Sequence, residues 1–202
     1  MSSLPFMKQY VSKPKTVGAV LPSSKYLADR IIKYINFDYA CYIVEYGPGT
    51  GVFTDRMLRE RKQDTIILLF ECNAEFYKIL KQKYKDEQNF YIVNDSAEHI
   101  GKYLATYGIP YVDYIVSGLP FASLPRDVSS SILAQTRKYL KEGGRFITFQ
   151  YTLTMKSFIG QFFNEIGIER EVRNFPPAYV FCCSEAFALA PSILQKQWVD
   201  KK

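Results

Sequence analysis

A glycine-rich segment, Glu45-Tyr46-Gly47-Pro48-Gly49-Thr50-Gly51, follows directly on the apolar run 41–44. Glycine lets the backbone take a positive φ or lie against a ligand with no Cβ in between. We therefore expect a buried strand that ends in a carboxylate, then a tight turn against a ligand, then a helix over 52–58. A tight turn without a ligand is the alternative. A nicotinamide fingerprint would need glycine where Val52 stands, so the spacing argues against hydride transfer.

Two further carboxylates follow apolar strands in the same order. Glu71 ends the run 66–70 and lies about 20 residues after Gly51, the offset at which an acidic residue binds a ribose diol. A carboxylate only accepts hydrogen bonds and can take both hydroxyls. Asp95 ends a third short strand, over 91–94. A single carboxylate at a strand end is commonly a turn or helix cap, but three in this order favour one shared ligand.

With Glu45 in front of it, the glycine segment resembles the first motif of Rossmann-like methyltransferases that use S-adenosylmethionine. The resemblance implies that Glu45 faces the methionine ammonium of the cofactor, that the turn packs against the cofactor, and that Asp95 accepts from the adenine amino group. The cofactor-binding residues implied are Ser23, Glu45, Gly47, Gly49, Gly51, Glu71, Cys72, Asp95, Ser96 and Ser117.

A second motif, Ser117-Gly118-Leu119-Pro120-Phe121, follows the strand over 112–116. Methyltransferases that act on planar amino groups often show N-x-P-Y or N-x-P-F here. Their Asn side chain and the carbonyl before Pro hold the amine hydrogens, and the aromatic ring stacks on the base. The Asn position is Gly118 in this chain, which offers no side-chain acceptor. Ribosomal RNA adenine dimethylases also carry an extra C-terminal helical domain, for which we expect no room in 202 residues.

Four segments, 17–24, 45–51, 117–120 and 174–178, are similar to the bacterial soluble-type phospholipid N-methyltransferases, which convert phosphatidylethanolamine stepwise towards phosphatidylcholine. The chain departs from them at Phe175, where leucine is more usual. The resemblance implies methyl transfer to a headgroup amine. RNA adenine N6-methylation is the alternative reaction, and a catalytically weak cofactor-binding protein that docks on a membrane or partner is the alternative of another class.

Methyl transfer needs a neutral amine held in line with the sulfonium methyl carbon, so positioning dominates the chemistry. We expect the carbonyls of Gly118 and Leu119, with Ser117 and Tyr151, to orient the amine. Phe121 would stabilise the cationic product by a cation–π contact. No strong general base is evident, and His99 is expected to be a surface or helix-start residue.

Alternating strand and helix signals predict the elements that position these residues. They indicate one α/β domain over 1–202, a Rossmann-like class I methyltransferase with a mostly parallel seven-stranded sheet, helices on both faces and an antiparallel C-terminal strand. Gly143 and Gly144 are expected to end a helix. The expected strands are about 42–46, 66–71, 90–94, 112–117, 145–151, 168–174 and 178–187, and the expected helices include 73–84, 126–140 and 155–166.

Residues 1–36 form a basic N-terminal helical extension that we expect to cover the site. Its first apolar positions, from Leu4 to Val11, recur at helical spacing beside lysines. Such a segment can lie on an anionic membrane, meet RNA phosphates, or pack on the sheet. The second stripe, Leu27, Ile31, Tyr34 and Ile35, is expected to be core.

Composition limits the protein class. The chain has 202 residues, 48% hydrophobic content and a net charge of +6, enough for one full core. Four cysteines, a single histidine and no C-x-x-C argue for reduced thiols and against a metal site. No apolar run is long enough to span a membrane. We expect a cytoplasmic monomer, peripheral on the inner face of the cell membrane.

Overall fold

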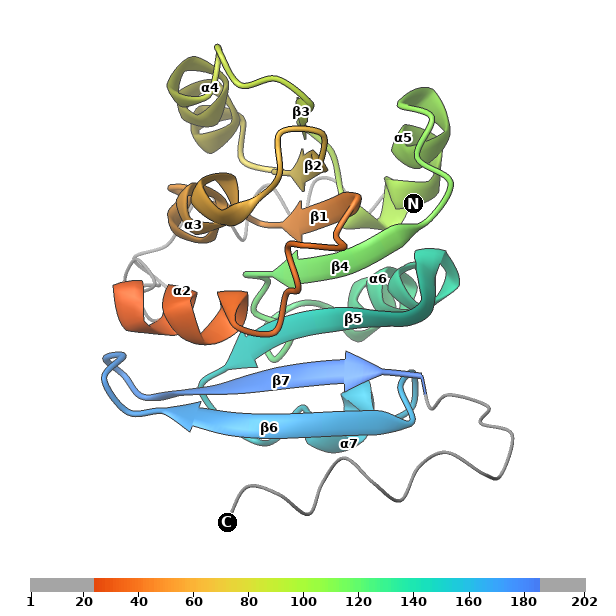
Figure 1. The fold of residues 1–202 in the computed structure, drawn as a ribbon. Coiled ribbons are helices and arrows are strands. Elements are labelled where there is room, and N and C mark those ends of the chain that lie inside the picture. Colours follow the sequence, from red (N-terminus) through yellow and green to blue (C-terminus); the bar gives the residue numbers. More distant parts are fainter. Residues whose placement is uncertain (1–23, 186–202) are drawn as a thin grey trace.

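The computed structural model describes residues 24–185, and in that range a seven-stranded sheet has the order β3-β2-β1-β4-β5-β7-β6 (Figure 1). β1 to β5 pair in parallel, and β7 lies antiparallel between β5 and β6. A mostly parallel sheet with an antiparallel C-terminal strand is what the sequence predicted. The strands are β1 (Tyr42–Tyr46), β2 (Ile66–Phe70), β3 (Phe90–Val93), β4 (Val112–Ser117), β5 (Leu140–Gln150), β6 (Glu165–Glu171) and β7 (Ala178–Ser184).

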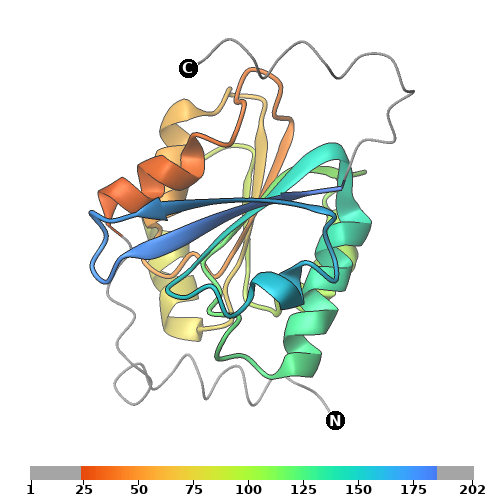
Figure 2. The same cartoon turned by 90° about the horizontal axis from the view of Figure 1, so that it is seen from below.

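Helices cover both faces of the sheet, as Figure 2 shows for α2 and α6 on opposite sides. One face carries α2 (Lys25–Ile32), α3 (Val52–Glu60) and α4 (Ala74–Lys83), and the other carries η1 (Ala97–His99), α5 (Ile100–Thr106), α6 (Arg126–Tyr139) and α7 (Lys156–Ile159). The predicted stripe on α2 is confirmed, because Leu27 and Ile31 are fully buried and Ile35 nearly so. Each face therefore buries its own hydrophobic cluster.

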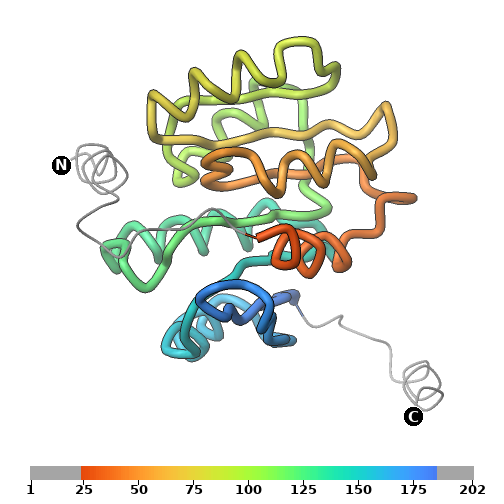
Figure 3. Tube along the Cα trace, turned by 90° about the vertical axis from the view of Figure 1, so that its left-hand side faces the viewer, coloured from red at the N-terminus to blue at the C-terminus, as the bar shows by residue number. Residues whose placement is uncertain are grey.

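The parallel strands end level with one another. Tyr46 at the end of β1 is in register with Phe70 and with Ser117, and Phe70 is in register with Val93. Figure 3 views the molecule from this carboxyl edge of the sheet. The strand order reverses between β1 and β4, and ligands of open α/β sheets bind at such a switch point. The three predicted carboxylates and the second motif therefore meet at one edge.

Gly143 and Gly144 do not end a helix, contrary to the sequence prediction. α6 stops at Tyr139, and β5 already begins at Leu140, so both glycines lie inside the strand. The pairing with β4 shifts register there. A Cβ on Gly144 would lie 2.9 Å from the carbonyl oxygen of Asp113, so this glycine permits close approach of two strands.

The predicted helix over 155–166 is wrong for most of its length. Only Lys156–Ile159 is helical, turns follow from Gly160, and β6 begins at Glu165 rather than 168. The apolar residues at helical spacing, Phe158, Ile159 and Phe163, are buried all the same. The apolar spacing therefore predicted which residues are buried but not their secondary structure. Gly160 disfavours continuation of the helix.

Residues 1–23 and 186–202 lie outside the described range, and so do the predictions made on them. These are most of the basic N-terminal extension, the cofactor contact of Ser23 and the last residues of the final strand. Among the helices that are described, none combines the length and the apolar character needed to span a bilayer.

Candidate functional site

The glycine turn between β1 and α3 has a positive φ at Gly47, Gly49 and Gly51, of 62°, 55° and 84°. A Cβ on Gly47 would lie 2.9 Å from Leu119 Cδ2, and one on Gly51 would overlap the Tyr84 hydroxyl. The same atom on Gly49 would meet nothing within 4 Å. Packing inside the protein explains the first and third glycines, whereas Gly49 borders open space, as a turn that lies against a cofactor requires.

Glu45, at the end of β1, is fully buried. Its Oε2 accepts a 2.6 Å hydrogen bond from the Thr54 hydroxyl, and Oε1 has no hydrogen-bond partner among residues 24–185. Burial raises the pKa of Glu45 to about 8, against the effect of the Thr54 hydrogen bond. A buried polar atom without a hydrogen-bond partner is costly. This unpaired oxygen fits the cationic methionine end of the cofactor that the sequence resemblance implied.

Glu71, at the end of β2, joins the glycine turn. Its Oε2 accepts from the Gly49 amide at 3.0 Å, and its Oε1 accepts from the Asn73 amide at 2.8 Å. Burial raises the pKa of Glu71, and these hydrogen bonds act in the opposite direction. The backbone of Cys72 also hydrogen-bonds to this carboxylate. A carboxylate has about four acceptor positions, so the group retains acceptor capacity for a ribose hydroxyl. The structure thus places Glu71 beside Gly49 of the glycine turn.

Asp95 lies beyond the end of β3 and already has hydrogen-bond partners among the residues that follow it. Its carboxylate accepts from the Tyr103 hydroxyl at 2.8 Å and the Ser96 amide at 2.7 Å, and lies 2.9 Å from His99 Nδ1. Burial acts to raise the pKa of Asp95, but the hydrogen bonds from His99 and Tyr103 outweigh it and the pKa is lowered. Asp95 therefore anchors the turn into α5, in addition to any contact with adenine.

Three neighbours complete this end of the site. The Cys72 thiol donates to the Asp95 carbonyl oxygen at 3.2 Å, and Ser96 is fully buried as the N-cap of η1. His99 ends η1 and is the N-cap of α5, with its side chain 46% exposed, so it is a surface residue at a helix start, as expected. Tyr103 was missed, because only the fold brings α5 beside the end of β3.

The second motif, residues 117–121, is hydrogen-bonded to the end of β1 and packs against the glycine turn. The Gly118 amide donates to the Tyr46 carbonyl at 2.8 Å. A Cβ on Gly118 would lie 2.7 Å from the Gly47 carbonyl oxygen, closer than real Cβ atoms come. Gly118 is therefore demanded by packing between the two motifs, and an asparagine would displace the glycine turn.

The carbonyl expected to orient the amine is partly occupied. Leu119 O accepts from the Phe121 amide at 3.0 Å and from Gln150 Nε2 at 3.3 Å. The Ser117 hydroxyl is buried and accepts from the Leu119 amide at 3.2 Å. Gln150, at the end of β5, was not foreseen, because its role depends on β5 lying beside β4.

The two aromatic candidates differ in exposure. Phe121 is 2% exposed and packs edge-on against Phe146, with ring centroids 6.1 Å apart. The expectation that Phe121 presents a free ring face to the substrate is therefore not met in this structure. Tyr151, just after β5, is 36% exposed and packs edge-on against Phe149. Tyr151 is thus the predicted site aromatic with an accessible surface.

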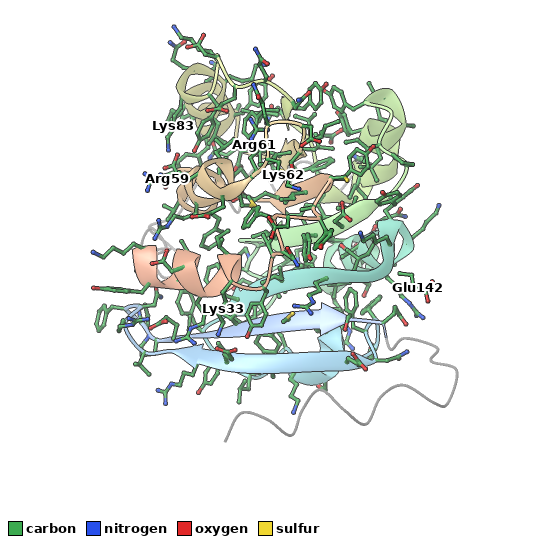
Figure 4. All side chains as sticks on the ribbon, viewed as in Figure 1. Lys33, Arg59, Arg61, Lys62, Lys83 and Glu142 are labelled. Carbon is green, nitrogen blue, oxygen red and sulfur yellow. The ribbon has the colours of Figure 1, made fainter. Side chains whose placement is uncertain are left out.

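An ion-pair cluster holds α2 against β6 near the same edge. Arg30 contacts Glu169 at 2.7 Å and Glu171 at 3.1 Å, and Lys33, labelled in Figure 4, also pairs with Glu169. The Ser24 amide donates to Asn174 Oδ1 at 3.1 Å, in the loop between β6 and β7. The chain therefore enters α2 beside the carboxyl edge. Among the residues described, no group of three or more His, Cys, Asp or Glu side chains could hold a metal ion.

Comparison with known proteins gives a consistent set of relatives. The family model described as ribosomal RNA adenine dimethylase matches residues 16–156. The chain is 27% identical over 180 residues to the ornithine lipid N-methyltransferase of Singulisphaera acidiphila, covering 88% of this chain and 93% of that protein. It is 27% identical over 126 residues to ribosomal RNA small subunit methyltransferase A of Persephonella marina, covering 62% of this chain but 44% of that one.

Solved structures are similar in fold at low sequence identity. An rRNA methylase from Streptococcus thermophilus aligns with a TM-score of 0.58 and 13% identity, over 79% of this chain and 94% of that one. The 16S rRNA N2 G1207 methyltransferase of T. thermophilus, solved with AdoMet and guanosine, aligns with a TM-score of 0.62 and 14% identity. That alignment covers 85% of this chain and 45% of that one.

Proposed function

The chain belongs to the ribosomal RNA adenine dimethylase family and is an S-adenosylmethionine-dependent N-methyltransferase with the Rossmann-like class I fold, and from this premise we propose that it methylates the headgroup amine of a membrane lipid. Phosphatidylethanolamine is the acceptor that the sequence motifs favour. Ornithine lipid is the other candidate, because it is named in the match that covers 93% of that relative.

The observation that carries the proposal is the packing of Gly118. Adenine N-methylation by the N-x-P-F arrangement needs an asparagine at this position, and the Gly47 carbonyl leaves no space for its Cβ. The close contact between the two motifs therefore excludes an asparagine side chain, and with it the amide acceptor, at position 118. A flexible aliphatic amine does not need a planar clamp, because it can be held by backbone carbonyls and hydroxyls alone.

The site residues divide into donor-side and acceptor-side groups. When bound, S-adenosylmethionine supplies an electrophilic methyl group. Glu45 would bind its methionine ammonium, and Glu71 would bind its ribose. The glycine turn at Gly49 would lie against it. Ser117 and the Gly118 and Leu119 carbonyls would orient the amine, and Tyr151 would contact the cationic product. The contribution of this chain is positioning, which in favourable cases supplies about 7–11 kcal/mol of the barrier reduction.

Exposed apolar residues at the carboxyl edge support docking on a lipid surface. Val172 and Phe175, in the loop between β6 and β7, are 63% and 82% exposed, and Leu153, after β5, is 46% exposed. Arg173 lies among them with its side chain 57% exposed, although its guanidinium also pairs with the buried Glu171. Apolar and cationic groups together are typical of contact with an anionic membrane. We propose that the basic residues before α2 add to this contact and cover the site.

A transfer assay with labelled S-adenosylmethionine tests the proposal. The full chain is offered vesicles containing phosphatidylethanolamine, vesicles containing ornithine lipid, or ribosomal RNA, and Gly49→Val serves as the inactive control. We expect label in one of the lipid pools and none in RNA. Label in RNA alone would replace this proposal by adenine methylation, and label in none of the pools, with the cofactor still bound, would favour a binding protein.

A further inference from the structure

A cavity of about 260 Å³ opens between the loop that joins β4 to α6, which begins with residues 118–119, and the loop that joins β5 to α7. Both loops leave the sheet at its carboxyl edge (Figure 3). Phe121, Leu124, Met155 and Phe158 contribute apolar walls, and Arg126 and Ser129 contribute polar groups. None of the predicted cofactor-binding residues lines this cavity, so it is separate from the predicted cofactor site.

Ser129 is a polar group without a partner in this cavity. The residue is 1% exposed, and its Oγ makes no hydrogen bond to any residue within 24–185. A buried hydroxyl normally finds a partner. Ser129 can donate one hydrogen bond and accept others, so it can pair with an ordered water or with a polar group of a ligand that enters the cavity.

Arg126 and the start of α6 add positive potential. Arg126 is the first residue of α6, a helix of 14 residues whose N-cap, Pro125, makes no side-chain cap. Its guanidinium stacks on the Phe158 ring at 5.0 Å and makes no ion pair with the residues described. The free amides at a helix N-terminus and an arginine both favour an anion. Asp127, in the same turn, is exposed and does not line the cavity.

We propose that this cavity binds the anionic group of a zwitterionic headgroup, the phosphate or carboxylate that accompanies the methylated amine. The inference rests on the proposed function and adds a specificity determinant to it. Residues 117–119 would hold the amine, and Arg126 and Ser129, further along the same loop and helix, would hold the anion. The distance between the two positions then selects headgroups by the spacing of amine and anion.

The test uses three soluble probes on the full chain with S-adenosylmethionine present: glycerophosphoethanolamine, ornithine and ethanolamine. Arg126→Met keeps a long, flexible side chain beside Phe158 but removes the charge, and Ser129→Ala removes the hydroxyl. Arg137→Met, near the other end of α6, is the matched control. We expect Arg126→Met to weaken a probe that carries an anion by about 10- to 100-fold and to leave ethanolamine and cofactor affinity unchanged.

The outcomes separate the two proposals. Loss confined to glycerophosphoethanolamine identifies a phosphate as the anion, and loss confined to ornithine identifies a carboxylate. The KM for the corresponding lipid should rise in Arg126→Met more than kcat falls, and Arg126→Lys should restore part of the difference. If the native enzyme methylates lipid but Arg126→Met changes neither probe binding nor KM, the anion site is refuted while the lipid function stands. If no lipid is methylated, the proposed function fails first.

Discussion

At the scale of single residues, comparing Gly49 with Gly108 distinguishes an effect on cofactor binding from an effect on backbone strain. Gly49 and Gly108 both have a positive φ and open space around an added Cβ. Alanine at either position should cost about 1–2 kcal/mol of backbone strain. Only Gly49→Ala should also lose affinity for S-adenosylmethionine, and Gly49→Val should abolish binding with the far-UV spectrum unchanged. Calorimetry that finds equal cofactor affinity in Gly49→Val and native protein would remove the turn from the binding site.

Glu45 should make stability depend on pH in a way that the cofactor suppresses. Burial raises its pKa from 4.5 to about 8. Within that window the unfolded chain releases this proton and the fold retains it, so stability falls as pH rises. Glu45→Gln lacks this titration and should show a flatter Tm across the window. Bound S-adenosylmethionine would place an ammonium near the carboxylate and flatten the native profile too; a profile that the cofactor leaves unchanged would place Glu45 outside the site.

Residues of the site were predictable where strand ends set their position. Glu71 was predicted at the end of the second strand, about 20 residues after Gly51, and the structure has it there with its Oε2 accepting from the Gly49 amide. Gln150 and Ser129 were not foreseeable, because their positions depend on packing between segments far apart in the chain. Phe121 was misjudged for the same reason: its ring is covered by Phe146, which no local pattern indicates.

At the scale of elements, α2 depends on a carboxylate buried in β6. Glu171 is 1% exposed and is bonded by Arg173 and Arg30. The hydrogen bond from Arg173, with help from Arg30, lowers the pKa of Glu171 to about 2. The stability it gives is present above the ordinary glutamate pKa of 4.5 and is lost as pH falls towards 2. We expect Glu171→Gln to cost about 1–3 kcal/mol at neutral pH.

A matched substitution on the same strand controls for the loss of charge. Glu165, at the exposed start of β6, donates nothing and only accepts from the Ser184 hydroxyl, so Glu165→Gln should change stability by less than about 0.5 kcal/mol. Urea denaturation at neutral pH and at pH 3 compares the two. Equal effects of both substitutions would show that the cluster does not hold α2 in place.

Elements themselves were predictable where periodicity and length agreed. β1, β2, β4 and α6 fall within a residue or two of their expected bounds. The start of β5 was not predictable, because Gly143 and Gly144 are typical of a turn. Only the close approach of Asp113 to Gly144 shows why glycine is needed inside the strand.

At the scale of the whole molecule, the apolar residues at the carboxyl edge should control membrane binding. Phe175 is 82% exposed at this edge, and Tyr39, which precedes β1 at the opposite edge, is 76% exposed. Transfer of a phenylalanine side chain out of water is worth about 1.5–3 kcal/mol. Phe175→Ser should therefore reduce co-sedimentation with anionic vesicles about tenfold or more, and Tyr39→Ser should leave it unchanged. Equal losses, or no loss in either variant, would exclude this edge as the docking surface.

Because these segments share one edge of the sheet, a docked enzyme would meet its lipid substrate within the plane of the membrane. The glycine turn, the segment 117–119 and the loop that carries Phe175 all leave the sheet on one side. A molecule docked through that loop keeps its reacting centre against the bilayer from one turnover to the next. Its rate should then follow the mole fraction of acceptor lipid in the surface rather than its bulk concentration, so inert lipid mixed into the same vesicles should slow the reaction by dilution in the plane.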